Sequence, residues 1–310
     1  MHLAQMDALD CVLGNFHVMS MIYCADCTNR APWGVKLNPS PQSVHFHAPR
    51  SGKCWIRVDN HVVELQTGDF AVLPHGTKHD VIDDPGTPGI RAAILLERTP
   101  RTNPWVMQFG GTGFQTRIIC AGFICAKGAQ FPLMAFLPNL IHLRADTTAS
   151  LEPILALAEN EMQTPQQATD VILARLAELL VVEAVRTYLK TLKPGEFGWL
   201  AALQDSKISR ILALIHRDPA HPWTLHALSQ EAAMSRSALT ARFRDVAGLP
   251  IRAYIVRLRM ATAANLLQRP GRADLASIAD QVGYKSEAAF IRAFTRSMGT
   301  SPTRFRSPVS

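Results

Sequence analysis

The segment VGYKSEAAFIRAFTRSMGTSPTRFR, residues 282–306, limits the possible fold more than any other part of the chain. Gly283 predicts a tight turn, and Ser286 stands after it where it can cap a helix, without the glutamate that would complete a capping box. Phe290 and Phe294 are four residues apart, so they share one face of that helix. We therefore predict a turn followed by a helix with an aromatic inner face.

The outer face of the same helix is basic, because Arg292 and Arg296 are also four residues apart on a different side. Gly299 predicts the end of the helix, and Pro302 prevents its continuation. Upstream, residues 275–282 have the apolar spacing of a short amphipathic helix. Two helices joined by a tight turn, the second with a basic face, are typical of a helix-turn-helix unit.

A second unit of the same kind precedes it in the chain. A first helix is predicted from Leu225, with Leu225 and Leu228 inward, and Ser235 is placed to cap the helix that follows. Phe243 lies on the inner face of this second helix, which ends at Gly248. We predict the two helix-turn-helix units at residues 225–246 and 275–298.

A long helix is predicted between the two units. Pro250 opens it at a favourable first position, and Pro270 closes it after Arg269. Its twenty residues would span about 30 Å at ~1.5 Å per residue. Because one turn of B-DNA is roughly 34 Å, two recognition helices held this far apart can enter successive major grooves.

The positive charge of the chain is confined to this C-terminal part. Residues 205–310 contain 16 Lys and Arg against 7 Asp and Glu, whereas residues 1–204 contain 16 against 18. A near-neutral part followed by a strongly basic part is typical of nucleic-acid-binding proteins. The partner predicted for the C-terminal part is therefore double-stranded DNA.

The length and the apolar stretches indicate two domains and no membrane span. A chain of 310 residues with 47% apolar residues can bury two cores. Its first fifteen residues lack the basic start and apolar core of a signal peptide. The longest apolar stretches, 118–126 and 179–182, are too short to cross a bilayer. We expect a cytoplasmic protein whose six cysteines are thiols.

Residues 30–125 are predicted to form an antiparallel sandwich or barrel. Short runs rich in Val, Ile, Phe and Trp alternate with Pro, Gly and Asp turns. Asp59 and Asn60 separate two of these runs as a two-residue hairpin. The predicted strands are 43–47, 54–58, 61–65, 70–73 and 90–96.

The most specific pattern of this region is GDFAVLPHGTKHDVID, from Gly68 to Asp83. The order of Gly68, Pro74, Gly76 and His79 resembles the second motif of the cupin fold, with Asp83 in place of the usual Asn. The resemblance implies a small barrel into which His79 points.

The first cupin motif is poorly kept. If Gly52 is its glycine, two prolines stand at its histidine positions and His45 stands at its glutamate position. His45 and His79 would then be left as ligands, with His47 on the same strand face as His45, and three imidazoles suit iron, zinc or copper. We favour the alternative, in which these histidines hydrogen-bond within the barrel or line an organic-ligand pocket with Trp55, and we expect no cofactor.

The cysteines allow three interpretations. Cys24 and Cys27 have the spacing of zinc ligands or of a redox pair. The second half of a zinc site would be Cys120 and Cys125, which point to opposite faces of a predicted strand. Inert buried thiols are favoured over a redox sensor and over structural zinc. The redox candidates are Cys24, Cys27, Cys54 and Cys120, of which Cys54 has Lys53 beside it to lower its pKa.

The pattern becomes helical from residue 151 to 192. The stretch 169–189 has an apolar surface too wide for a single neighbour, made of Ile172, Leu176, Leu179, Leu180, Val182, Val185 and Leu189. Either this helix docks on the barrel and also meets a second subunit, with Leu176 and Leu180 in the interface, or it is buried within one chain. Lys193-Pro194-Gly195 then predicts a linker.

Together these segments resemble the AraC/XylS family of bacterial transcription regulators, in the branch with an N-terminal cupin domain. The similarity is carried by GYKSEAAFIRAFTRSMGTSPTRFR, by residues 216–243 and by residues 44–85. It implies a sequence-specific regulator, usually a homodimer, that answers a small molecule or a stress and recruits or blocks RNA polymerase. The implied parts are an all-β sensor barrel at 1–145, a helical dimerisation and linker region at 146–195, and an all-α DNA-binding domain at 196–310.

The residues expected to touch DNA follow from the helical wheel. Base contacts of the second recognition helix are predicted opposite Phe290 and Phe294, at Glu287, Ala288, Ile291, Arg292 and Thr295. The first recognition helix has Ala241 where the family often has Arg, so it would rely on Ser237, Thr240 and Arg244. Phosphate contacts are predicted at Arg236, Arg244, Arg257, Lys285 and Arg296.

A cupin enzyme tethered to DNA, such as a metal-dependent dioxygenase, is the rival from another class. The missing glutamate and the two prolines at the expected histidine positions count against it, and we expect no enzymatic activity. Some cupin-type members of the family are understood to sense oxidants through cysteines. We nevertheless favour an organic ligand over thiol oxidation as the signal, because few of these cysteines have a basic neighbour.

Overall fold

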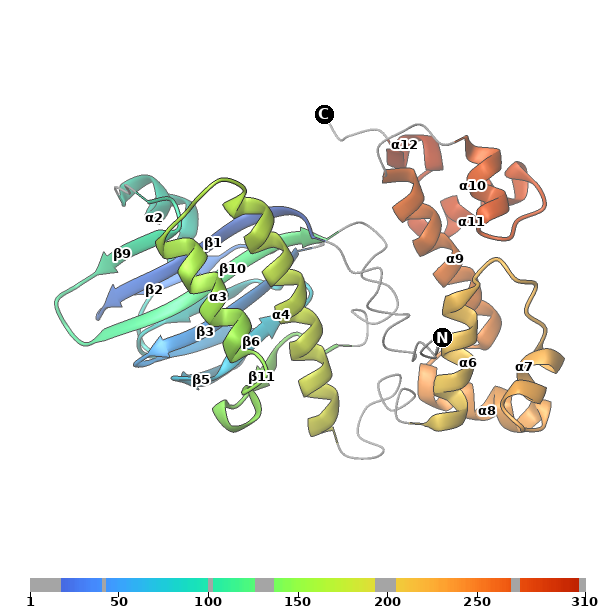
Figure 1. Cartoon of the computed structure of the whole chain (residues 1–310), viewed down its shortest axis with the longest axis horizontal. Helices are drawn as coiled ribbons and strands as arrows, with labels where there is room; N and C mark the ends of the chain where they lie inside the picture. Colours follow the sequence, from blue (N-terminus) through green and yellow to red (C-terminus); the bar gives the residue numbers. More distant parts are fainter. Residues whose placement is uncertain are drawn as a thin grey trace. The chain divides into compact units, whose positions relative to one another are not determined.

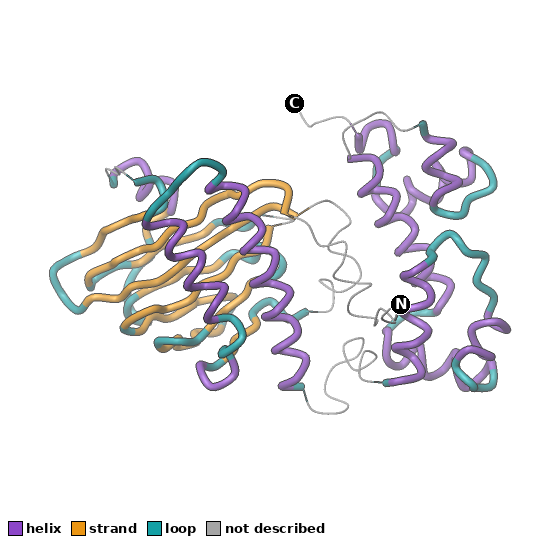
Figure 2. The backbone as a smooth tube through the Cα atoms, viewed as in Figure 1, coloured by secondary structure: helices purple, strands orange, loops and turns teal. Residues whose placement is uncertain are grey.

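The computed structural model describes residues 18–40, 43–99, 103–125, 137–192, 205–268 and 274–306. They form two compact units, of which the first holds the strands and the helices up to residue 191 and the second holds the helices from residue 206 (Figure 1). Figure 2 shows strands in the first unit alone. The predicted fold class, a β-rich N-terminal part followed by an all-helical C-terminal part, is confirmed.

The described strands of the first unit form two sheets. The six-stranded sheet has the order β11 (Ile141–Leu143), β6 (Phe70–Leu73), β3 (Ser43–Ser51), β10 (Gln115–Cys125), β1 (Val18–Arg30) and β9 (Val106–Gly110). The five-stranded sheet has the order β5 (His61–Gln66), β4 (Lys53–Val58), β7 (His79–Ile82), β2 (Gly34–Leu37) and β8 (Ile90–Arg91).

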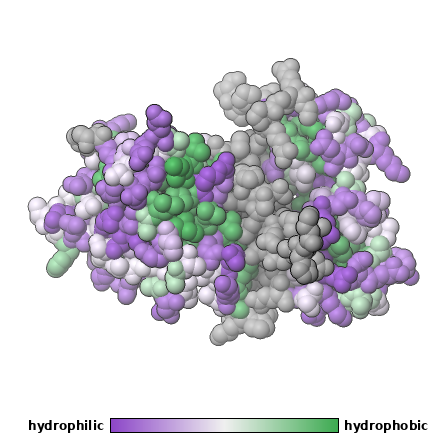
Figure 3. All heavy atoms as spheres, in the orientation of Figure 1, coloured by the Kyte–Doolittle hydropathy of each residue, from purple (hydrophilic) through white to green (hydrophobic). Residues whose placement is uncertain are grey.

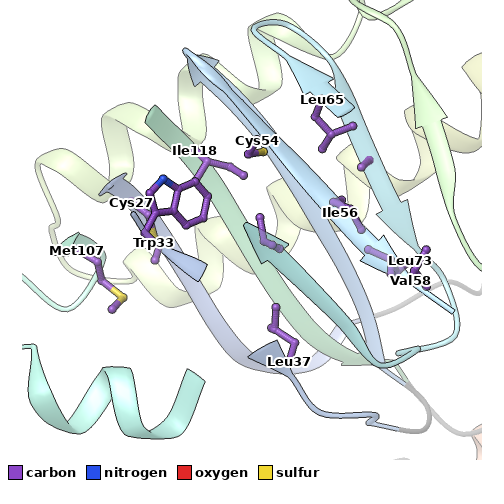
Figure 4. Packing of buried hydrophobic residues seen from close by; sticks show 13 residues of the cluster. Cys27, Trp33, Leu37, Cys54, Ile56, Val58, Leu65, Leu73, Met107 and Ile118 are labelled. Carbon is purple, nitrogen blue, oxygen red and sulfur yellow. The ribbon is translucent and has the colours of Figure 1, made fainter. Parts of the chain in front are cut away.

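The core lies between the two sheets, and side chains of both contribute to it (Figure 4). Cys54, Ile56 and Leu65 come from the five-stranded sheet, and Leu73 and Ile118 come from the six-stranded sheet. All five are nearly or completely buried. Because successive side chains of a strand alternate between its faces, this core selects every second residue of each strand.

Two of the strand predictions need comment. The hairpin at Asp59 and Asn60 is confirmed, since Val58 pairs with His61 across it. The strand predicted at 90–96 is wrong beyond its first two residues, because α2 (Ala92–Arg98) is a helix. Short apolar runs such as AAILL fit either structure, so periodicity alone does not separate the two. The first strand, β1, begins well before the region predicted as β.

Two helices lie on the six-stranded sheet. They are α3 (Glu152–Gln163) and α4 (Thr169–Thr191), which pack against each other and against β1. Leu176 and Leu180 of α4 are buried inside the unit, so the prediction that they form a subunit interface is wrong. Ile172 and Leu179 on the other side of α4 are exposed. Figure 3 shows apolar side chains gathered over this part of the molecule.

The second unit consists of short helices around one long helix. They are α6 (Ser206–Arg217), α7 (Leu225–Glu231), α8 (Arg236–Ala247), α9 (Ile251–Gln268), α10 (Leu275–Gln281), α11 (Glu287–Met298) and α12 (Pro302–Arg306). The predicted caps are confirmed, since the hydroxyls of Ser235 and Ser286 accept from Ala238 N and Ala289 N. Gly248 and Gly299 end α8 and α11 at φ 68° and 72°, where glycine is unstrained.

The buried faces of the two helix-turn-helix units agree with the sequence pattern at most positions. Leu228, Phe243, Phe290 and Phe294 are buried as predicted. Leu225 is not, because it is the first residue of α7 and its side chain is 38% exposed. In the described part of the chain, every helix is too short or too polar to span a bilayer.

Candidate DNA interface and ligand pocket

The recognition helices α8 and α11 each have one buried and one exposed face. In α8, Leu239 and Phe243 pack inward while Arg236, Ser237, Thr240 and Arg244 are exposed, as predicted for groove-facing residues. In α11, the exposed residues are Glu287, Ala288, Arg292, Thr295 and Arg296. Each face therefore offers donors and acceptors of the kind that read base edges.

Ile291 differs from the other residues predicted on the outer face of α11. It is only partly exposed, because it packs against the cluster of Met260, Ile278 and Phe294. Its position, next to Phe290, lies at the edge of the apolar face and contributes to the core. The helical wheel alone does not give the width of that face.

Among the exposed basic residues of this unit, one group forms ion pairs with described carboxylates, and another group consists of the residues predicted to contact DNA. Arg242 donates to the Asp205 carboxylate, and Arg210 donates to Glu231 at 2.8 Å, so both are neutralised within the protein. Arg236, Arg244, Arg257, Lys285 and Arg296 are exposed, and Arg292 stands among them on α11. The second group contains every phosphate candidate predicted from the sequence. Sequence alone did not separate Arg242 from Arg244, because Asp205 is far away in the chain.

Arg259 holds the two helix-turn-helix units together, and sequence reasoning missed it. From α9, its Nε donates to Pro219 O at 2.7 Å, and its Nη2 donates to Ala220 O and His221 O at 3.1 and 2.9 Å. Its Nη1 donates to Gly283 O at 3.2 Å, in the turn between α10 and α11. One guanidinium thus links the loop before α7 to the turn of the second unit.

The three predicted histidines lie together in the barrel interior. His47 Nε2 and His79 Nε2 are 2.9 Å apart, and His79 Nδ1 is 2.7 Å from Thr77 O. A carbonyl only accepts, so His79 Nδ1 carries a proton, and in neutral rings His79 Nε2 accepts from His47 Nε2. His47 Nδ1 then remains as an acceptor, 3.2 Å from Cys120 Sγ.

His45 is held by a second set of hydrogen bonds. The Ser43 hydroxyl donates to Ser40 O at 2.6 Å, so it accepts from His45 Nε2 at 2.9 Å. His45 Nδ1 then accepts from the Tyr23 hydroxyl at 2.9 Å. Gly122 leaves room for this pair, because an added Cβ would lie 2.5 Å from the Tyr23 ring and 2.6 Å from His45 Nδ1.

These imidazoles do not fit a metal site. Their ring nitrogens are engaged in hydrogen bonds within the protein, and no group of three ligating side chains in the described residues is arranged around a common point. Burial lowers the pKa of His45 to about 3 and of His79 to about 4, and it lowers the pKa of His47 well below its usual value. All three are neutral hydrogen-bonding groups at pH 7.

A cavity of about 300 Å³ lies in the first unit beside this cluster. Its walls come from β1, from β2 and from the segment 104–109, and α2 closes it with Ala92, Leu95 and Leu96. The lining residues are Ile22, Tyr23, Cys24, Ala25, Cys27, Asn29, Trp33, Val35, Leu37, His47, Val81, Ala92, Leu95, Leu96, Pro104, Trp105, Met107, Phe109, Ile118 and Cys120.

The predicted pocket residues are only partly in this wall. His47 lines the cavity, whereas His45 and His79 are buried next to it and do not. The prediction for Trp55 is wrong, because β4 turns this side chain to the face opposite Cys54 and Ile56, where Lys53 Nζ lies 4.7 Å from its ring centroid. The alternation along β4 contained this information, but the sequence pattern did not identify which face is inner.

Three thiols in and near the cavity have raised pKa values. Cys24, Cys27 and Cys120 line it, while Cys54 is buried in the core. Burial raises the pKa of Cys24 and of Cys54 to about 12. A hydrogen bond with Cys27, together with burial, raises the pKa of Cys120. The expectation that Lys53 lowers the pKa of Cys54 is wrong, because Lys53 lies over Trp55 instead.

Comparison with known proteins gives consistent matches over both units. Residues 7–190 match the family model described as Cupin, and residues 228–307 match a helix-turn-helix domain. The transcriptional regulator AlkR of Acinetobacter baylyi is 34% identical over 309 residues, which are 97% of this chain and 99% of AlkR. A Streptomyces lividans protein described as an AraC-like transcription regulator is 34% identical over 278 residues, which are 88% of this chain and 90% of that protein.

Among solved structures, the DNA-binding domain of AdpA in complex with a target DNA is similar to part of this chain. The identity is 25%, the TM-score is 0.30, and the match covers 31% of this chain and 86% of that chain. The two recognition helices, the barrel and the full-length relatives identify the chain as a member of the AraC family of transcription regulators, with a cupin ligand-binding domain and a helix-turn-helix DNA-binding domain.

Proposed function

We propose that this regulator is a cytoplasmic homodimer that responds to a neutral, mainly apolar small molecule bound in the barrel cavity. The observation that carries the proposal is the composition of the cavity wall, in which the described lining residues include no Lys, Arg, Asp or Glu. An ionised ligand would lose its hydration there without gaining a partner charge. Most of the wall is aliphatic or aromatic, as in pockets that bind organic ligands.

The proposed DNA contacts lie on the exposed faces of α8 and α11. We assign base contacts to Ser237, Thr240, Arg244, Glu287, Ala288, Arg292 and Thr295, with Ile291 as a packing residue beside them. Phosphate contacts fall to Arg236, Arg244, Arg257, Lys285 and Arg296, at the ends and flanks of the helices. Residues 196–310 would thus bind promoter DNA and influence RNA polymerase there.

The dimer is assigned to the outer face of α3 and α4. Val171, Ile172 and Leu179 of α4 and Leu157 of α3 are 39–59% exposed. Exposed large apolar side chains gathered on one face are typical of protein interfaces. Residues 146–195 would therefore carry the subunit contact, while residues 1–145 would form the sensor.

Two alternatives are less well supported. A dioxygenase-like enzyme would need metal ligands, and the histidines are occupied by hydrogen bonds to the protein. Oxidant sensing would need thiolates, and the raised pKa values of Cys24, Cys54 and Cys120 keep them as thiols. Replacing all six cysteines by Ser or Ala should leave induction in vivo intact. Loss of induction with intact DNA binding would instead favour thiol sensing.

A cavity-filling variant tests the ligand proposal. Ala25→Phe puts a ring into the cavity from β1, and Val62→Phe adds the same ring on the exposed face of β5. Transcript profiling of a deletion strain identifies the regulated genes, and footprinting of the DNA upstream of those genes identifies the operator. Ala25→Phe should bind that operator like the parent and lose its response to inducing conditions, whereas Val62→Phe should keep both. An Ala25→Phe protein that still responds would contradict the assignment of the ligand to this cavity.

A further inference from the structure

Two residues of the cavity wall each have a buried polar atom without a hydrogen-bond partner among the described residues. These atoms are the side-chain oxygen Oδ1 of Asn29 and the indole nitrogen Nε1 of Trp33. Asn29 is 1% exposed and Trp33 is 4% exposed, so both side chains are buried. Nearly all buried polar groups in proteins are hydrogen-bonded, and an unpaired one destabilises the fold. Two of them in one cavity wall therefore indicate an occupant.

Their positions follow from the strand order. Asn29 is on the face of β1 that carries Tyr23, Ala25 and Cys27 into the cavity. Trp33 follows the end of β1 and packs edge-on against Phe109 of the adjacent β9, with ring centroids 6.1 Å apart. Figure 4 shows the Trp33 indole in the core cluster that also contains Cys27 and Ile118.

The chemistry of the two atoms specifies the occupant's polar group. An indole N–H only donates, and an amide oxygen only accepts. A single group that satisfies both must accept one hydrogen bond and donate another, as a hydroxyl does. A carboxylate or an ether accepts without donating, and an ammonium donates without accepting. Because no Lys, Arg, Asp or Glu stands among the wall residues that the structure describes, both ions are disfavoured there as well.

Two other polar side chains of the wall, Tyr23 and His47, already have hydrogen-bond partners within the protein. The Tyr23 hydroxyl is bonded to His45, and His47 is bonded to His79 and Cys120. Tyr23 and Asn29 are six residues apart on β1, which corresponds to roughly 20 Å along the strand. The wall between and around them is formed by side chains such as Leu95, Met107 and Ile118. The body of the ligand is therefore apolar.

We propose that Trp33 and Asn29 form a head-group subsite for the hydroxyl of a neutral ligand, a phenol or an alcohol with an apolar body. This inference rests on the ligand cavity of the proposed function and adds to it the polar group that is recognised. Trp33 Nε1 donates to the hydroxyl oxygen, and the hydroxyl hydrogen is donated to Asn29 Oδ1.

A matched series of probes tests the subsite with the full-length protein. 4-Pentylphenol, 4-pentylanisole, pentylbenzene and 4-pentylbenzoate share one body and differ in the head group. Binding is measured by isothermal titration calorimetry at pH 7, where the benzoate is ionised. 1-Octanol and its methyl ether repeat the comparison on an aliphatic body. The phenol and the alcohol should bind at least about tenfold more tightly than their methyl ethers, because each ether leaves Asn29 unpaired.

Three variants connect that preference to the two residues. Trp33→Phe removes the donor and keeps an aromatic ring, and Asn29→Leu removes the acceptor with little change in shape. Trp105→Phe makes the same change as the first variant in another tryptophan of the wall, whose indole nitrogen is not among the unpaired buried atoms. Both subsite variants should lose most of the preference for hydroxyl over ether, whereas Trp105→Phe should keep it. A thermal unfolding transition like that of the parent, followed by circular dichroism, checks that the barrel of each variant is folded.

The possible results separate the subsite from the cavity itself. Equal affinities for phenol, anisole and pentylbenzene in the parent protein would overturn the subsite and leave an apolar ligand cavity. A preference for hydroxyl that survives in both Trp33→Phe and Asn29→Leu would place the head group elsewhere and also overturn it. Tightest binding of the benzoate, or no binding of any probe up to its solubility, would overturn the subsite together with the neutral-ligand proposal.

Discussion

The Nε2 atoms of His47 and His79 lie 2.9 Å apart in the barrel interior, and the direction of the hydrogen bond between them is set by Thr77. Because the Thr77 carbonyl accepts from His79 Nδ1, the hydrogen between two neutral rings belongs to His47 Nε2. Burial disfavours the charged form of both rings, so their pKa values are lowered. Adding protons to the cluster therefore costs free energy in the folded state, which gives the barrel a defined pH dependence.

We predict that the first unit loses stability as the pH falls below about 6.5. The pKa of His79 is about 4 in the folded state against 6.5 for the free side chain, and that of His45 is about 3. The unfolded chain thus binds more protons between these values, so the free energy of unfolding decreases as the pH falls, by on the order of 3 kcal/mol per buried imidazole. Urea denaturation at pH 7, 5.5 and 4.5 measures it.

A variant tests whether the buried histidines His45, His47 and His79 cause this change of the unfolding free energy with pH. His79→Gln cannot be protonated, so its unfolding free energy should fall less steeply with decreasing pH than that of the parent. His61→Gln removes an exposed histidine of β5 and should keep the parental slope. The interpretation fails if His79→Gln and His61→Gln have the same pH dependence.

Arg259→Met should destabilise the helical unit by about 2–4 kcal/mol, because hydrogen bonds from a charged group to several carbonyls are lost. It donates to the carbonyls of Pro219, Ala220, His221 and Gly283. Arg252→Met changes an exposed arginine of the same helix and should have an effect within about 0.5 kcal/mol. Thermal unfolding followed by circular dichroism compares the two, and equal midpoints would contradict the role given to Arg259.

Arg292→Ala should weaken operator binding by about 1–3 kcal/mol and relax the preference at one base pair, as expected for a residue that reads a guanine. Arg236→Ala, a phosphate candidate, should weaken binding to all sequences alike and lower the salt slope by about one unit. Titrations against operator and random DNA at several salt concentrations distinguish the two effects. If Arg292→Ala weakens both DNAs equally, Arg292 contacts phosphate instead.

Ile172→Glu with Leu179→Glu should convert the proposed dimer to a folded monomer, because both side chains are exposed on α4. Leu176→Glu should unfold the first unit, since Leu176 is buried in it and a charge there costs several kcal/mol. Val62→Glu, on exposed β5, is the control that should leave the dimer unchanged. Sedimentation velocity measures the association state. A double variant that sediments as the parent does would move the interface away from α4.

The helical unit could be predicted from the sequence because its signals are local. Ser235 and Ser286 cap the recognition helices, and Gly248 and Gly299 end them, within a few residues of the positions they act on. Arg259 was missed because its acceptors are separated from it by 24 to 40 residues in sequence. A tertiary contact of this kind has no local pattern.

The barrel was predicted less completely. The turn at Asp59 follows from a local pattern and is confirmed. The inward direction of His79 was implied by the resemblance to the second cupin motif, and this side chain is buried. The side of the sheet that faces the cavity depends on which strands pair, so Trp55 was assigned to the wrong face. Asn29 and Trp33 were not noticed at all, because a single Asn or Trp has meaning only when its partners, or their absence, are known.

The Arg259 link has a consequence for promoter architecture. If the two helix-turn-helix units are held in one relative orientation, they cannot adjust to a different rotational phase between the two halves of the binding site. Moving one half of the operator by five base pairs turns it to the far side of the duplex, since B-DNA repeats about every 10.5 base pairs. Genuine operators of this protein should therefore share one fixed spacer length, and that constancy distinguishes them from chance matches in a genome.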